Sequence, residues 1–182
     1  MPGSMNADVA LVLDASTSMR DGRTLTGRTK LNAAVAAAQG FVDAMAMPQD
    51  QAAVVVFNED AQVLQGLTGR RADVGQALRE IPRHVRRQTR IDLGIGSGHR
   101  ELVGADRNSQ NRPVMIVLTD GLSNPVPASA AVRKALDAQR DGVAHLGDAP
   151  GQHRHQAAQR AVVAVLLARQ FGHAQQVLEL LD

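Results

Sequence analysis

The amino-acid sequence predicts an α/β fold in which a mainly parallel sheet is covered by helices on both faces. Short aliphatic runs alternate along the chain with longer segments whose apolar residues recur at helical spacing. The aliphatic runs show little polar alternation, which is typical of strands buried on both faces of a parallel sheet. The chain has 182 residues, 44% of them hydrophobic and 21% charged, and this size and composition indicate one globular domain.

A loop separates the first predicted strand from the first long helix. Residues 9–13 (VALVL) form a short aliphatic strand that is followed by polar residues. Asp21, Gly22 and Gly27 mark the following segment as a loop. Apolar residues then recur at helical spacing over 31–45, which predicts a helix that buries one apolar stripe.

A hairpin and a shorter helix are expected next. Residues 52–57 and 61–67 are predicted strands, and the connector 58–60 has the length of a hairpin turn. Apolar residues at helical spacing over 74–81 predict a short helix, which ends at Pro82.

The segment 89–103 begins like a helix but contains Gly94, Gly96 and Gly98. Glycines weaken a helix by propensity, unless close packing against the sheet favours small residues. The segment does not fit a dinucleotide-binding fingerprint, because no strand precedes it and His99 stands where the third glycine would be. We therefore expect these glycines to pack a helix against the sheet.

The clearest central strand covers residues 113–118, and a helix is predicted over 128–139. After that helix the pattern degrades. Residues 143–147 could form a weak strand, whereas 157–168 are apolar on most sides. The sheet edge beside the strand 113–118 is then either uncovered, which would favour aggregation, or covered by 157–167.

These patterns predict a domain over residues 5–142 and an atypical C-terminal completion of the same domain over 143–182. The abrupt change in composition after position 142 would fit a native, a diverged or an out-of-frame ending.

The composition excludes several function classes. The chain has no cysteine, so disulfides, thiolate metal sites and cysteine nucleophiles are excluded. Its aromatic residues are three phenylalanines, and its net charge is only +2, so we expect no nucleic-acid partner. No apolar run approaches a membrane span and the N-terminus lacks a signal-peptide core, so we expect a cytoplasmic chain without membrane insertion.

Oxygen-bearing side chains follow two of the predicted strands. Asp14, Ser16 and Ser18 come at alternate positions after the first strand, and Asp120 follows the strand 113–118. Ligands of open parallel sheets bind at the carboxyl ends of the strands, where the strand order reverses. If these strands are neighbours, an all-oxygen set converges there that suits Mg²⁺ better than a closed Ca²⁺ cage. Taken alone, the first three residues would also fit a helix cap or a serine-rich turn.

Three parts of the sequence form one motif: the run Asp14-Ala-Ser16-Thr-Ser18-Met19, Thr89 ahead of a helix, and the run Leu118-Thr119-Asp120-Gly121. Together they resemble the von Willebrand factor type A (VWA) domain and its metal-ion-dependent adhesion site. The resemblance covers about residues 7–142. It implies a doubly wound, Rossmann-like sheet with one antiparallel edge strand, and C-terminal strands that are atypical or missing here.

The resemblance also implies roles for the five residues of the site. Ser16 and Ser18 would be direct Mg²⁺ ligands, and Mn²⁺ or Ca²⁺ could substitute for Mg²⁺. Asp14 and Asp120 would act mostly through bound waters and hydroxyl hydrogen bonds. Thr89 would join when a carboxylate of a ligand binds.

A basic run over 83–90 leads into Thr89 where relatives usually have a glycine-rich segment. It is either a solvated loop or, with Arg20, Arg23 and Arg28, a rim that steers an acidic partner toward the cation.

The sequence therefore predicts a non-enzymatic, Mg²⁺-dependent domain that binds an Asp or Glu side chain of a protein partner. No histidine has a motif that would tie it to Ser16 or Ser18 as a general base. The alternative is a non-catalytic subunit of an ATPase-driven, chelatase-like complex. A phosphohydrolase is disfavoured, because it would need a second acid in place of Ser16.

Overall fold

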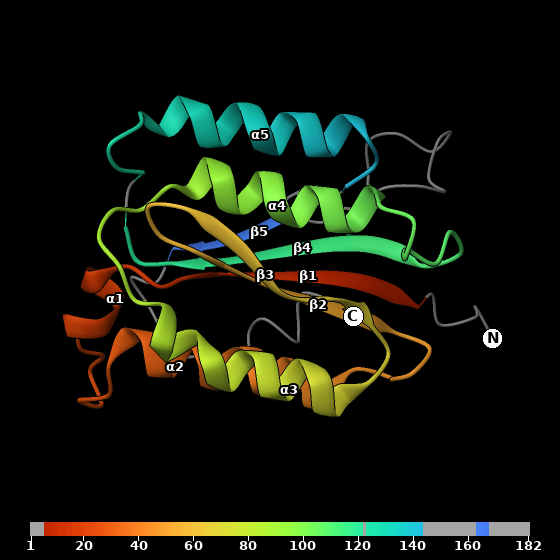
Figure 1. Cartoon of the computed structure of the whole chain (residues 1–182), viewed down its shortest axis with the longest axis horizontal. Coiled ribbons are helices and arrows are strands. Elements are labelled where there is room, and N and C mark those ends of the chain that lie inside the picture. The colour runs from red at the N-terminus through yellow and green to blue at the C-terminus, as the bar shows by residue number, and fades with distance from the viewer. Residues whose placement is uncertain (1–5, 122, 144–162, 168–182) are drawn as a thin grey trace.

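The computed structural model describes residues 6–121, 123–143 and 163–167. Within them, a five-stranded sheet in the order β3-β2-β1-β4-β5 forms the middle layer (Figure 1). Its strands are β1 (Ala7–Asp14), β2 (Gln51–Phe57), β3 (Ala61–Thr68), β4 (Arg112–Thr119) and β5 (Val163–Leu167). Three neighbouring pairs are parallel, and only β2 and β3 are antiparallel. The predicted mainly parallel sheet with one antiparallel edge strand is therefore confirmed.

Helices cover both faces of this sheet. The helices are α1 (Thr17–Asp21), α2 (Lys30–Ala44), α3 (Arg71–Glu80), α4 (Ile91–Val103) and α5 (Ala128–Arg140), with a 3-10 turn η1 (Ile81–His84) after α3. In Figure 1, α2 and α3 lie on one side of the sheet, and α4 and α5 on the other. This arrangement is the doubly wound one that the VWA resemblance implies.

Successive residues of β1 enter two different cores. Val9, Leu11 and Leu13 belong to the core beneath α2 and α3. Ala10 and Val12 belong to the core beneath α4 and α5. Because both faces of β1 are buried over 9–13, this part of the strand favours apolar side chains at successive positions, which explains its unbroken aliphatic sequence.

Close packing explains two of the three glycines in α4. A Cβ atom at Gly94 would lie 2.7 Å from the ring of Phe57, and one at Gly98 would lie 2.7 Å from Cγ2 of Val12. A Cβ atom at Gly96 would have Nη1 of Arg100 as its nearest neighbour, at 3.8 Å. The packing interpretation is therefore confirmed for Gly94 and Gly98, which let α4 approach the sheet, but not for Gly96.

The short helix α1 was not predicted from the sequence, in which Asp21, Gly22 and Gly27 marked a loop between the first strand and the first long helix. Its five residues, Thr17–Asp21, make only one turn. One turn is too short to show an apolar period, and the only buried side chain in it is Met19. The consequence is that Ser18 lies in a helical turn and not in an open loop.

The edge of the sheet beside β4 is covered. Strand β5 pairs in parallel with β4, from Met115↔Val163 to Thr119↔Leu167. Of the two outcomes considered for this edge, the structure has the one in which it is covered: residues 163–167 of the predicted segment 157–167 supply the strand, and 157–162 lie outside the described residues. Val143 is buried without belonging to a strand, and the rest of the predicted weak strand 143–147 lies outside the described residues. No helix among the described residues combines the length and apolar character needed to cross a membrane.

Candidate metal site

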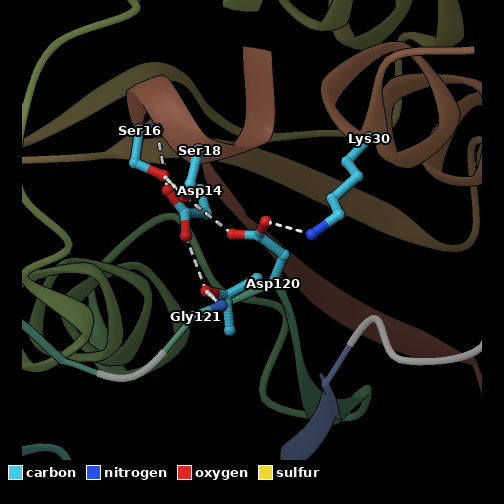
Figure 2. A network of polar contacts seen from close by, with 7 residues as sticks. Asp14, Ser16, Ser18, Lys30, Asp120 and Gly121 are labelled. Carbon is cyan, nitrogen blue, oxygen red and sulfur yellow. Dashed lines mark hydrogen bonds and ion pairs between the residues drawn. The ribbon is translucent and has the colours of Figure 1, made fainter. Parts of the chain in front are cut away.

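The carboxyl ends of β1 and β4 lie side by side, because the two strands are parallel and paired up to Leu13↔Leu118. Asp14 is the last residue of β1, and Asp120 directly follows β4. The adjacent strands therefore bring together two carboxylates that are far apart in the sequence, as the sequence predicted. Figure 2 shows them with Ser16 and Ser18 at this edge of the sheet.

A chain of hydrogen bonds connects the four residues. The backbone N–H of Ser16 donates to Oδ1 of Asp14 at 2.8 Å. The hydroxyls of Ser16 and Ser18 are 2.9 Å apart, and the Ser18 hydroxyl donates to Oδ1 of Asp120 at 2.9 Å. The structure thus places four of the five predicted site residues in one continuous set of oxygen atoms.

Among these oxygen-bearing residues, Asp14 is fully buried. Burial raises the pKa of the Asp14 carboxyl to about 6, although hydrogen bonds from Thr119 and Ser16 oppose this rise. The negative charge of Asp120 raises the pKa further. A positive charge at this edge would stabilise the ionised form of Asp14.

Backbone contacts hold the segment that carries the serines. The N–H of Ala15 donates to the carbonyl of Phe57 at 2.8 Å, and the N–H of Arg86 donates to the carbonyl of Ala15 at 3.1 Å. Ser16 is itself buried and forms an isolated β-bridge with Arg86. The serines therefore follow β1 in a segment fixed by β2 on one side and by the chain after η1 on the other.

Thr89 lies in a segment fixed by other backbone contacts. Its N–H donates to the carbonyl of Asn124 and its carbonyl accepts from the N–H of Asn124, both at 2.9 Å. The next residue, Arg90, donates its N–H to the carbonyl of Asn58 at 2.7 Å. Thr89 is buried, but among the described residues no hydrogen bond joins its side chain to the other four predicted ligands.

The backbone just before Thr89 has an unusual conformation. Gln88 has a φ of 67°, in the left-handed region that favours glycine. Gln88 adopts this conformation within the basic run that stands where a glycine-rich segment is expected from the resemblance.

Lys30 is a residue of this site that sequence reasoning missed. It is the first residue of α2, and its Nζ lies 2.7 Å from Oδ2 of Asp120 (Figure 2). The Asp120 side chain is 4% exposed and that of Lys30 is 29% exposed. No spacing rule predicts this contact, because the turn after α1 decides where α2 begins.

Most arginines of the expected basic rim have acidic partners. The ion pairs are Arg83 with Glu80, Arg86 with Glu59, Arg90 with Asp92, and Arg20 with Asp21. Arg23, Arg28 and Arg87 are exposed and form no ion pair within the described residues. The arginines without an acidic partner are therefore the ones whose charge is left to steer an acidic protein toward the site.

The donor set determines which ion this edge could hold. The described residues contain no cluster of three or more His, Cys, Asp or Glu side chains. A cation here would therefore need the hydroxyls of Ser16 and Ser18 besides Asp14 and Asp120. Such a set of oxygen ligands with few carboxylates fits a hard divalent cation that keeps several waters, such as Mg²⁺.

Several solved structures are similar to this chain. BatB from Bacteroides thetaiotaomicron, described as a conserved hypothetical protein, is 23% identical with a TM-score of 0.65, and the match covers 76% of this chain and 64% of BatB. An aerotolerance-related membrane protein from Bacteroides fragilis is 18% identical with a TM-score of 0.67, over 96% of this chain and 97% of that one. At these identities the similarity shows the fold.

A further similar structure was solved with a bound metal. Proximal thread matrix protein 1 from the mussel byssus was solved with zinc in its metal-ion-dependent adhesion site (MIDAS) motif. It is 26% identical to this chain, with a TM-score of 0.63. The match covers 77% of this chain but only 34% of the mussel protein. This chain therefore spans about a third of that relative and just under two thirds of BatB.

The family assignment comes from the sequence itself. No curated protein sequence matches the chain significantly. Residues 9–123, more than half of the chain, match the family model described as the von Willebrand factor type A domain. This stretch contains all five predicted ligands, from Asp14 to Asp120. The chain belongs to the von Willebrand factor type A domain family.

Proposed function

We propose that this chain is a Mg²⁺-dependent protein-interaction domain whose cation binds an Asp or Glu side chain of a partner protein. One observation carries the proposal: the Ser18 hydroxyl donates to Oδ1 of Asp120, which links the segment after β1 to the end of β4. Membership of the VWA family and the zinc-occupied motif of the mussel protein support it.

Each ligand has a distinct role in the proposal. Ser16 and Ser18 bind the cation directly. Asp14 and Asp120 supply the negative charge, mostly through bound waters and through hydrogen bonds to the hydroxyls. Because two carboxylates offset the charge of a divalent ion, a further carboxylate from a partner can complete the coordination shell, and Thr89 joins at that stage. Mn²⁺ or Ca²⁺ could replace Mg²⁺.

The proposed domain is not an enzyme. A serine nucleophile needs a general base within hydrogen-bond reach. The Ser16 hydroxyl is bonded to that of Ser18, which donates to Asp120, and no histidine in the described part of the chain is bonded to either serine. Metal binding uses the same hydroxyls.

Calorimetry of Mg²⁺ binding tests the metal site. The parent should bind Mg²⁺, and Asp14→Ala and Ser18→Ala should bind it far more weakly. Ser18 is exposed, so its truncation leaves folding intact even if loss of the buried Asp14 does not. Asp43→Ala, on the exposed surface of α2, removes one carboxylate elsewhere and should bind like the parent. Equal binding by all four proteins would refute the metal site.

Retention of a partner tests the interaction. The immobilised domain should retain a protein in Mg²⁺ and release it on addition of chelator, and the Ser18→Ala domain should retain none. Replacing one Asp or Glu of the retained protein should abolish binding. A retained protein that hydrolyses ATP would favour the alternative, a non-catalytic subunit of an ATPase-driven, chelatase-like complex.

A further inference from the structure

Lys30 places a positive charge at the candidate metal site. Its Nζ lies 2.7 Å from Oδ2 of Asp120, while Oδ1 of Asp120 accepts the Ser18 hydroxyl. Both oxygens of this carboxylate are thus engaged. In Figure 2 the lysine reaches Asp120 from the side opposite to Ser16 and Ser18.

The side chain of Lys30 runs past Gly22 on its way to Asp120. The N–H of Lys30 donates to the carbonyl of Gly22 at 3.0 Å. A Cβ atom at Gly22 would lie 2.9 Å from Cδ and 3.0 Å from Cε of Lys30. The lysine stem therefore lies directly against Gly22, and the short turn after α1 aims it at Asp120.

Charge explains what the lysine does. Without a positive charge, the carboxylates of Asp14 and Asp120 would face each other in a site that is largely buried. The ammonium group supplies one of the two positive charges that would offset them. A divalent ion that enters the site meets an ammonium group already bound to one of its carboxylates, and like charges repel.

We propose that Lys30 is a tethered cation that stabilises the metal-free site and that a divalent ion must displace from Asp120 in order to bind. The inference rests on the proposed function, because it assumes that Asp120 belongs to a metal site. It deepens that function by assigning a residue that lowers the affinity of the site for the metal. A higher concentration of the metal is then needed to fill the site.

Calorimetry with Mg²⁺ alone tests the inference on the full chain. Lys30→Met keeps the length of the stem and removes the charge, and it should bind Mg²⁺ about tenfold more tightly than the parent, because a partly solvated repulsion is lost. Lys30→Arg keeps the charge and should bind like the parent. Lys134→Met, at the only other lysine of the chain, removes the same net charge from the exposed surface of α5 and should also bind like the parent.

Thermal unfolding gives a second readout. In chelator, Lys30→Met should unfold at a lower temperature than the parent, because Asp120 has lost its counter-charge. Saturating Mg²⁺ should raise the unfolding temperature of Lys30→Met more than that of the parent. Lys30→Gln, which is also uncharged, serves for both measurements if the Met variant does not fold.

The outcomes separate this inference from the proposed function. Tighter binding by the uncharged variants supports it. Equal or weaker binding by them, with the parent binding Mg²⁺ normally, overturns the role of Lys30 and leaves the metal site standing. No binding by the parent or by any variant overturns both.

Discussion

Asp14 and Thr119 lie 105 residues apart in the sequence and are joined by a buried hydrogen bond of 2.6 Å, from the threonine hydroxyl to Oδ2 of the aspartate. Thr119 also accepts the N–H of Gly121 at 3.3 Å, so it connects the buried carboxylate to the turn that carries Asp120. The bond links the ends of β1 and β4 directly. The stability of this edge therefore depends on the ionisation of one carboxyl group.

The raised pKa of Asp14 predicts a pH dependence of folding in the absence of metal. The folded carboxyl, with a pKa of about 6, binds a proton more tightly than the unfolded one, near 3.8. Its contribution to the free energy of unfolding is therefore largest below pH 3.8 and is lost as the pH rises through about 6, by roughly 3 kcal/mol in all.

Urea unfolding in chelator, compared between the parent and Asp14→Asn from pH 4 to 7, measures this contribution, because the other carboxyl groups cancel in the difference. The stability advantage of the parent over the variant should shrink as the pH rises. A difference that stays constant over this range would contradict the prediction. Mg²⁺ should reduce the loss, because a bound cation favours the ionised form of Asp14.

The close packing of α4 predicts opposite effects of alanine at two of its glycines. Gly98→Ala should lower the free energy of unfolding by about 1–3 kcal/mol, because the new Cβ would overlap Val12. Gly96→Ala should raise it by up to about 1 kcal/mol, since alanine favours the helix and meets no close atom there. Chemical denaturation of the two variants checks this, and similar losses in both would show that packing is not the cause.

The left-handed backbone at Gln88 predicts that glycine is better suited to this position. Gln88 is exposed, so its side chain contributes little packing. Gln88→Gly should stabilise the protein by up to about 1 kcal/mol, because relief of strain exceeds the entropy lost on folding. Gln88→Val should destabilise it by about 1–2 kcal/mol, because a β-branched residue tolerates a positive φ poorly. Thermal unfolding measures both changes, and the reverse order would disprove the explanation.

Thr89 and Ser16 should differ in their effects on metal binding. Ser16→Ala removes a hydroxyl from the hydrogen-bonded set and should weaken Mg²⁺ binding about tenfold or more. Thr89→Ala removes a hydroxyl that is not bonded to that set within the described residues, so its Mg²⁺ affinity should change much less, while retention of an acidic partner is lost. Calorimetry and retention on the immobilised domain measure the two effects separately. Equal loss of Mg²⁺ affinity would assign Thr89 to the metal-binding set itself.

Much of the fold could be predicted because each long element carries its own pattern. The aliphatic run over 9–13 and the helical spacing over 31–45 are local properties of the sequence, and the structure places β1 and α2 within two residues of them. The one-turn helix α1 was missed because a helix of five residues shows no period. Gln88 was missed because a strained φ depends on how the chain is held on either side.

The sequence by itself placed Asp14, Ser16, Ser18 and Asp120 after the ends of two parallel strands, and residues that follow neighbouring parallel strands meet at the same edge of the sheet. The pairing of β1 with β4 in the structure makes the two strands neighbours. Only the tertiary structure decided that the ammonium group of Lys30 lies beside Asp120. Lys30 reaches Asp120 through a turn and a helix start 90 residues away, and such a contact depends on the path of the chain in space, which no local pattern records. Tertiary contacts likewise decided that Arg86 pairs with Glu59 and that β5 covers the edge of β4.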